Sequence, residues 1–124
     1  MRPFALCAAV LVSAGLGCAG SVPAPNDQWM AAQTEIARAQ GSGAEDTPEG
    51  KLYLRLARED LRRARAAMGS DNARAASLIE VSRTESRLAT SIAKTATAQH
   101  EARRAATELQ NAQREPAGSQ GGKP

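Results

Sequence analysis

The sequence contains few of the residues that build large cores and stacked surfaces. Phe4, Trp29 and Tyr53 are its only aromatic residues, and alanine supplies most of the apolar content. A core made mainly of alanine is thin, because each buried methyl group contributes little. The same scarcity argues against nucleic-acid binding, which usually relies on stacking aromatics. No alternating run of β-branched residues occurs after residue 25, so β-strands are not expected.

Residues for catalysis or metal binding are also scarce. His100 is the only histidine, and we expect it to face solvent on a polar stretch. Without a second histidine or a spare cysteine, we expect no metal site and no cofactor. Gly41 and Gly43 are followed by acidic residues that would repel phosphate, and the neighbours Glu59 and Asp60 point to different faces of a helix. We therefore expect a protein that is not an enzyme and has no small-molecule substrate.

The N-terminus indicates an export signal. Arg2 precedes the apolar stretch Phe4–Leu16, which has the length of a signal h-region and is shorter than the about 20 residues that a membrane span needs. Small residues then lead into Cys18, a pattern that resembles a lipobox, although Gly15 stands where leucine is preferred. The resemblance implies a signal peptide over residues 1–17, cleavage before Cys18 and lipidation of its thiol. The alternative is an ordinary secretory signal with an incidental cysteine.

Lipidation of Cys18 would determine the cellular compartment of the protein. Cys7 lies in the removed segment, so the mature chain would keep one cysteine and form no internal disulfide. Ala19 follows Cys18 where inner-membrane lipoproteins typically carry aspartate. The lipobox resemblance therefore implies an outer-membrane lipoprotein, anchored by fatty acyl chains such as palmitate, with its polypeptide in the periplasm. Residues 18–26 are small and proline-bearing, which predicts a flexible tether.

The remaining sequence predicts one all-α domain over residues 27–114, followed by a disordered tail over 115–124. A break at Gly41–Gly43 ends the first helix, and the short connection at Gly69–Asn72 predicts antiparallel neighbours. We therefore expect a small three-helix antiparallel bundle, or a helical hairpin, with a long C-terminal helix. The expected helices cover residues 27–40, 48–68 and 72–114. Asn26 or Asp27, Thr47, and Asp71 or Asn72 are the expected N-caps.

Spacings of three and four residues predict the buried face of each helix. In the first helix this face contains Trp29, Ala32, Ile36 and Ala39. In the second it contains Leu54, Ala57, Leu61, Ala64 and Met68, widened by Leu52, Tyr53 and Leu56. In the third, the expected seam is Leu78, Val81, Glu85, Leu88, Ile92, Thr95, Gln99, Ala102, Ala106 and Leu109.

The third helix is about twice as long as the second, so residues 94–114 must overhang the bundle, bend back or pair with something else. If the helices alternate in direction, an overhang points away from the membrane. Its alanines could admit a partner helix in a coiled coil, or this part could be a frayed extension. Trp29 either anchors the first helix in the core or, being close to the tether, enters the membrane interface.

One helix face carries a basic stripe. Its members recur at spacings of four, three, four and three, and they are Lys51, Arg55, Arg58, Arg62 and Arg65. Glu59 stands four residues before Arg63, so part of the surrounding charge is paired internally. The stripe indicates contact with an anionic surface, such as phospholipid headgroups, lipopolysaccharide phosphates or peptidoglycan carboxylates. The alternative is a solvated face in an arginine-rich protein whose net charge is +3.

Several segments together resemble a known bacterial family. They are Ile36–Ala39, Gly43–Glu49, Leu52–Leu61, Ala64, Ala67 and Asp71–Ala76. On these residues, the chain from about Ala31 to Ala106 resembles the family named domain of unknown function 4398. The resemblance implies a short helical envelope lipoprotein and implies no molecular activity. The third helix departs from the family pattern, with Ser82, Thr84, Ser86 and Thr90 where members tend to carry alanine and acids.

The sequence as a whole predicts a membrane-anchored envelope lipoprotein with a structural, scaffolding or protein-interaction role. Its expected partners are the membrane, through Cys18, and an envelope protein or a second copy, through the third helix. The alternative function is a binding module for an anionic envelope polymer or membrane surface, through the basic stripe. A further alternative is an accessory subunit of a larger envelope assembly.

Overall fold

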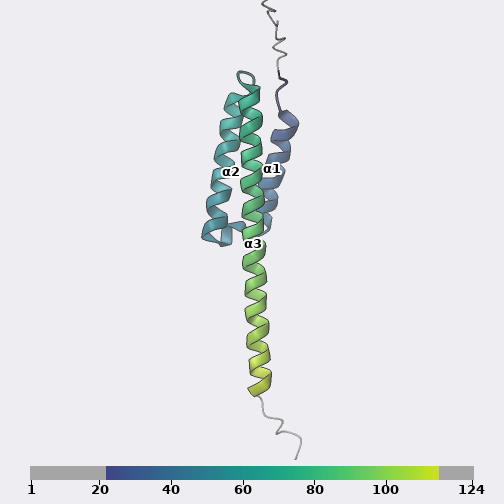
Figure 1. Cartoon of the computed structure of the whole chain (residues 1–124), viewed down its shortest axis with the longest axis vertical. Coiled ribbons are helices and arrows are strands. Elements are labelled where there is room, and N and C mark those ends of the chain that lie inside the picture. The colour runs from purple at the N-terminus through teal and green to yellow at the C-terminus, as the bar shows by residue number, and fades with distance from the viewer. Residues whose placement is uncertain (1–21, 115–124) are drawn as a thin grey trace, which may run out of the picture.

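Three helices and one short 3-10 turn make up residues 22–114, the part of the chain that the computed structural model describes (Figure 1). They are α1 (Asn26–Gly41), η1 (Ala44–Asp46), α2 (Pro48–Ala67) and α3 (Asn72–Arg114). This part of the chain contains no strand, which confirms the all-α bundle. Each helix begins and ends within one residue of the range expected from the sequence.

The ends of the chain lie outside the described residues, which exclude 1–21 and 115–124. The expected signal peptide at 1–17, Cys18, the first part of the tether and the expected tail therefore stay predictions. Within residues 22–114, no helix combines the length and the apolar character that crossing a bilayer requires.

The helices alternate in direction, and α3 lies between α1 and α2 (Figure 1). The turn between α2 and α3 lies at the same end as the start of α1. Asn72 shows this directly, because its Nδ2 donates a hydrogen bond to the Val22 carbonyl at 2.6 Å. The first described residues therefore touch the α2–α3 turn, and the far part of α3 leaves the bundle at the opposite end.

Local hydrogen bonds explain where the second and third helices begin. Thr47 caps α2 by accepting from the backbone N–H of Gly50 at 3.1 Å, and Pro48 occupies the first helical position. Asp71 accepts from the N–H of Arg74 at 2.9 Å and so caps α3. The expected cap of the first helix is wrong. The helix begins directly after Pro25, and neither Asn26 nor Asp27 makes a side-chain cap.

The buried faces of α1 and α2 follow the expected pattern, except that Leu52, which was expected to widen the face of α2, is 40% exposed. Ala32, Ile36 and Ala39 are buried on α1, and Leu54, Ala57, Leu61 and Ala64 are buried on α2. Trp29, Tyr53, Met68 and Leu78 are half-buried and pack against this cluster. Leu54 and Ile79 are the only large apolar side chains buried completely among the described residues, so the core is thin.

The expected seam of α3 is wrong by one residue throughout the bundle. The buried residues are Ala75, Ile79, Ser82, Ser86, Ala89 and Ala93. From Ile79 onward, each directly follows a residue of the expected seam, which corresponds to a rotation of about 100°. Val81 and Leu88, expected inside, are 43% and 41% exposed. Small side chains occupy the true seam because α3 packs against both other helices, and close packing leaves little volume there.

Two serines in this seam are buried, and the hydroxyl group of each makes a hydrogen bond. Ser82 Oγ donates to the Ala57 carbonyl of α2 at 2.8 Å, and Ser86 Oγ donates to the Ser82 carbonyl at 2.8 Å. Since both hydroxyl groups are satisfied, their burial costs little. The bond from Ser82 also joins α3 to α2 near the middle of the bundle.

The far part of α3 projects beyond the other helices as a straight continuation (Figure 1). We call residues 97–114 the arm. Every residue of the arm is exposed. At 1.5 Å per residue, the arm is about 27 Å long. Of the three arrangements that the sequence left open, α3 adopts the overhang within this single chain.

Candidate functional site

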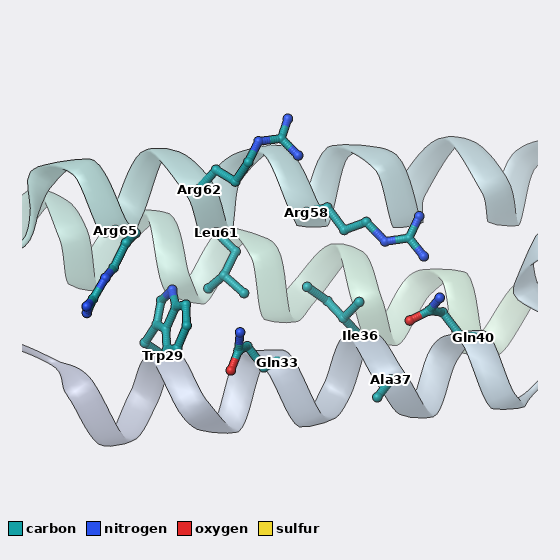
Figure 2. A pocket seen from close by; sticks show the side chains of 9 residues that line it. All are labelled: Trp29, Gln33, Ile36, Ala37, Gln40, Arg58, Leu61, Arg62 and Arg65. Atoms are coloured by element: carbon teal, nitrogen blue, oxygen red, sulfur yellow. The ribbon is translucent and has the colours of Figure 1, made fainter.

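An open groove with a volume of about 480 Å³ runs between α1 and α2 (Figure 2). Its floor consists of three apolar side chains, Trp29, Ile36 and Leu61. The α1 side is lined by Gln33, Ala37 and Gln40, and the α2 side by Arg58, Arg62 and Arg65. The groove therefore combines an apolar floor with one basic edge and one uncharged edge.

Helical spacing explains this combination. Leu61 lies three residues after Arg58 and four before Arg65, so these side chains are neighbours on the surface of α2. Trp29 and Ile36 are separated by two turns of α1, and they point toward Leu61 of α2, with which they form the floor (Figure 2). The groove forms because α1 and α2 present the margins of their core faces to one another, while their centres pack against α3.

The three arginines differ in their partners. Arg58 Nη2 lies 2.7 Å from Glu45 Oε1, and this hydrogen bond lowers the pKa of the Glu45 carboxyl group. The Arg65 guanidinium lies over the ring of Trp29, 5.3 Å from its centroid, in a cation–π arrangement. Within residues 22–114, neither Arg62 nor Arg65 forms an ion pair with a carboxylate.

Trp29 is half-buried and contacts the core cluster, which supports its interpretation as a core anchor. Its Nε1 atom is buried and has no hydrogen-bond partner among the described residues. A buried N–H without an acceptor lowers stability by about 1–3 kcal/mol. A buried, unsatisfied donor therefore lies next to Arg65, and Arg62, one turn earlier on α2, also lacks a carboxylate partner among the described residues (Figure 2).

The structure divides the expected basic stripe into two parts. All five residues lie on α2, but only Arg58, Arg62 and Arg65 line the groove. Lys51 and Arg55 line a separate hollow near the start of α2, together with Glu45 and Asp46. The acidic residues of η1 partly neutralise that end. Within residues 22–114, Arg58 is the one member of the stripe that forms an ion pair, with Glu45, so Arg62 and Arg65 supply the positive charge of the groove that has no carboxylate partner.

An ion-pair cluster joins α1 to α3, and sequence reasoning did not identify it. Glu35 Oε1 accepts from Arg83 Nη2 at 3.0 Å and from Arg87 Nη2 at 3.1 Å. Burial raises the pKa of Glu35, but the hydrogen bonds from Arg87 and Arg83, with their positive charges, lower it by more. Because Arg83 and Arg87 both bind Glu35, we interpret this ion-pair cluster as a structural link between α1 and α3.

Glu85 lies on the flank of α3 that faces α2. Its Oε2 atom is buried and has no hydrogen-bond partner in the described part of the chain. Burial, then the negative charges of Asp60 and Glu59, raise its pKa. Asp60 and Glu59 instead pair with Arg63, and the Glu59–Arg63 pair agrees with the sequence prediction.

His100 lies on the arm and is exposed. Across residues 22–114, no group of three histidine, cysteine, aspartate or glutamate side chains is arranged to hold a metal ion.

Residues 27–105 match a protein-family model described as Domain of unknown function (DUF4398). The match includes α1, η1, α2, the groove and α3 as far as the first part of the arm. Comparisons with curated proteins and with solved structures find no match.

Proposed function

The chain belongs to the family described as domain of unknown function (DUF4398), and from this premise we propose that it is a non-enzymatic lipid-anchored scaffold of the bacterial envelope. In this proposal Cys18 is acylated and holds the bundle at the periplasmic face of the outer membrane. The arm of α3 then contacts another envelope protein.

The observation that carries this proposal is that Val22 and the arm lie at opposite ends of the bundle. Val22, four residues after Cys18, touches the α2–α3 turn through Asn72. The arm leaves the bundle at the other end and extends about 27 Å further. An anchor at Cys18 therefore puts the bundle near the lipid and directs the arm into the periplasm.

The arm is suited to binding a partner because none of its surface is used inside the bundle. All of its residues are exposed, including Leu109 at 60%. Isolated helices of this length are marginal in water, since most helices gain their stability from packing. A partner that packs against the arm would supply that stability.

Intact mass spectrometry of the membrane-extracted protein tests the anchor, with Cys18→Ala as the control. We expect a chain that starts at Cys18 and carries acyl groups, and we expect the variant to lose the acyl mass. An unacylated soluble species that is unchanged by the substitution would refute the anchor.

Photo-crosslinking in intact cells tests the arm. A crosslinking residue at Leu109 should give a protein adduct, whereas one at Met30 on α1, which is similarly exposed at 58%, should not. Equal adducts from both positions, or none from Leu109, would count against a scaffold that acts through the arm.

A second candidate function is binding to an anionic envelope polymer or membrane surface. It is supported by the concentration of Arg58, Arg62 and Arg65 along one groove. Binding through these residues should weaken strongly as ionic strength rises, because exposed charges are screened within about 10 Å at 0.1 M salt. Contact through the arm should depend little on salt, so a salt titration of envelope binding separates the two candidates.

A further inference from the structure

We propose that the α1/α2 groove binds an anionic amphiphile, namely a single acyl chain that carries a phosphate group. This inference narrows the second candidate function and depends on the same arginines. It does not depend on the anchor at Cys18. The phosphate would lie beside Arg62 and Arg65, and the chain would follow the floor toward Ala37 and Gln40.

The dimensions of the groove favour one extended chain. Its volume of about 480 Å³ falls within the range of about 300–1,000 Å³ that is typical of small-molecule sites. Its lining on α1 runs from Trp29 to Gln40, a span of twelve residues that is about 16 Å long from the first to the last. An elongated groove with an apolar floor suits a flexible hydrocarbon chain.

The charges of the groove favour an anionic headgroup. None of the nine lining residues is acidic, and three are arginines on the same edge (Figure 2). Guanidinium groups bind phosphate oxygens in pairs, with a geometry that lysine cannot supply. Glu45 engages Arg58, whereas Arg62 and Arg65 have no carboxylate partner within the described chain. The end of the groove near Trp29 is therefore the headgroup end.

The unsatisfied indole of Trp29 supports the same orientation. Its buried Nε1–H lacks an acceptor, and the Arg65 guanidinium lies over its ring. A phosphate that draws Arg65 away from the ring would bring acceptor oxygens close to this N–H. Binding would then satisfy a donor that the protein alone leaves unpaired.

The floor fits a lipid chain better than a docked acidic helix. A helix is about 10 Å wide with its side chains and buries an apolar stripe along several turns. The groove offers three large apolar side chains, all on its floor. An acidic amphipathic peptide is nevertheless the competing occupant, and the experiment includes one.

Trp29 makes the test direct, because it is the only tryptophan of the chain. The protein is used as the Cys18→Ala variant, which carries no acyl group of its own. Myristoyl lysophosphatidylglycerol, below its micelle concentration, is titrated by tryptophan fluorescence and by calorimetry. We expect saturable binding that is at least about tenfold weaker for the zwitterionic lysophosphatidylcholine of the same chain length.

Matched variants locate the site. Arg62→Gln with Arg65→Gln should weaken binding by about tenfold or more, as measured by calorimetry. Arg103→Gln with Arg104→Gln removes the same charge from the arm and should leave binding unchanged. Ala37→Phe, at an exposed position that lines the groove, should block the chain, whereas Ala31→Phe, at an exposed position outside the lining, should not.

Four results would overturn the inference. Equal affinity for the two lysolipids would show that the groove does not recognise the anionic headgroup. An equal loss of affinity in both double-arginine variants would show that only net charge matters. Binding of soluble polyphosphate as tightly as the lysolipid would leave the second candidate function standing and refute the acyl chain. Binding of an acidic amphipathic peptide without binding of the lysolipid would assign the groove to a protein partner.

Discussion

Gly50 lies in the first turn of α2, against the carbonyl oxygen of Ala44 in η1. A Cβ atom at this position would overlap that oxygen and lie 2.7 Å from the Oγ1 atom of Thr47, the cap of the same helix. Gly50→Ala should therefore destabilise the protein by about 1–3 kcal/mol, although alanine is the better helix former by about 1 kcal/mol. Thermal or urea unfolding measures the change.

Gly41, the last residue of α1, provides the matched control. A Cβ atom there would have no heavy atom within 4 Å. Gly41→Ala should leave stability unchanged or raise it slightly. Equal effects of the two substitutions would mean that η1 does not pack against α2 as described.

Glu85 should make the protein less stable at neutral pH. Its raised pKa means that the folded state holds the proton more tightly than the unfolded state does. Stability should therefore fall as pH rises from the unfolded glutamate value of about 4.3 through the folded pKa. Glu85→Gln should stabilise the protein at pH 7 by about 1 kcal/mol and have little effect below pH 4. Urea unfolding at both pH values measures this, and a stabilisation that persists below pH 4 would assign the effect to packing.

Glu35 should show the opposite pH dependence. Its lowered pKa gives stability that is present above the unfolded value of about 4.3 and is lost as pH falls through the folded pKa. Glu35→Gln should lower stability at pH 7 by about 1 kcal/mol, because Arg83 and Arg87 lose a charged acceptor. The difference between variant and wild type, followed by urea unfolding, should shrink in acid. A constant difference would show that this ion-pair cluster stabilises the fold through side-chain packing and not through charge.

Among the elements, α3 is the one whose orientation the sequence predicted wrongly, and a pair of adjacent substitutions tests the observed seam. Ala89 is completely buried, whereas Leu88 is 41% exposed. Ala89→Leu should cost about 1–3 kcal/mol by overpacking, and Leu88→Ala should cost less than about 1 kcal/mol. Chemical unfolding of both variants measures the contrast. The reverse order would support the seam expected from the sequence.

The error in α3 has a physical origin. Leu78, Val81, Leu88 and Ile92 recur at helical spacing, so they form a convincing apolar row on their own. The buried row beside it consists mostly of alanine and serine, which hydropathy cannot distinguish from surface residues. Ser82 becomes a core residue only because the Ala57 carbonyl of α2 accepts its hydrogen bond. That acceptor belongs to another helix and is not visible in the pattern of α3.

The sequence was more informative for α1 and α2. Each packs against one main neighbour, so a single row such as Leu54, Ala57, Leu61 and Ala64 defines its buried face. Thr47 and Pro48 fixed the start of α2 in the same local way. The groove was only partly predictable. Spacing placed Arg58, Arg62 and Arg65 on one face, but only tertiary packing brings Trp29 and Ile36 opposite them.

At the scale of the whole molecule, the bundle and the arm should behave as independent parts. A chain that ends at His100 lacks residues 101–114 of α3, all of which are exposed. Its unfolding midpoint should stay within about 2 °C of that of the intact chain, because core contacts largely determine the midpoint. Its circular dichroism should show less helix. A drop of many degrees would mean that the arm folds back onto the bundle in solution.

Because the arm is independent of the bundle, its length and the rotation of its tip about the helix axis can change without disturbing the fold. Seven residues inserted after His100 would extend its reach by about 10.5 Å and turn its tip by only about 20°. Five inserted residues would add about 7.5 Å but turn the tip by about 140°, away from its original bearing. Insertions and deletions in this part of the chain would therefore change how far from the bundle, and on which side of it, the tip of the arm can make a contact. The packing inside the bundle would not change with any of these insertions or deletions.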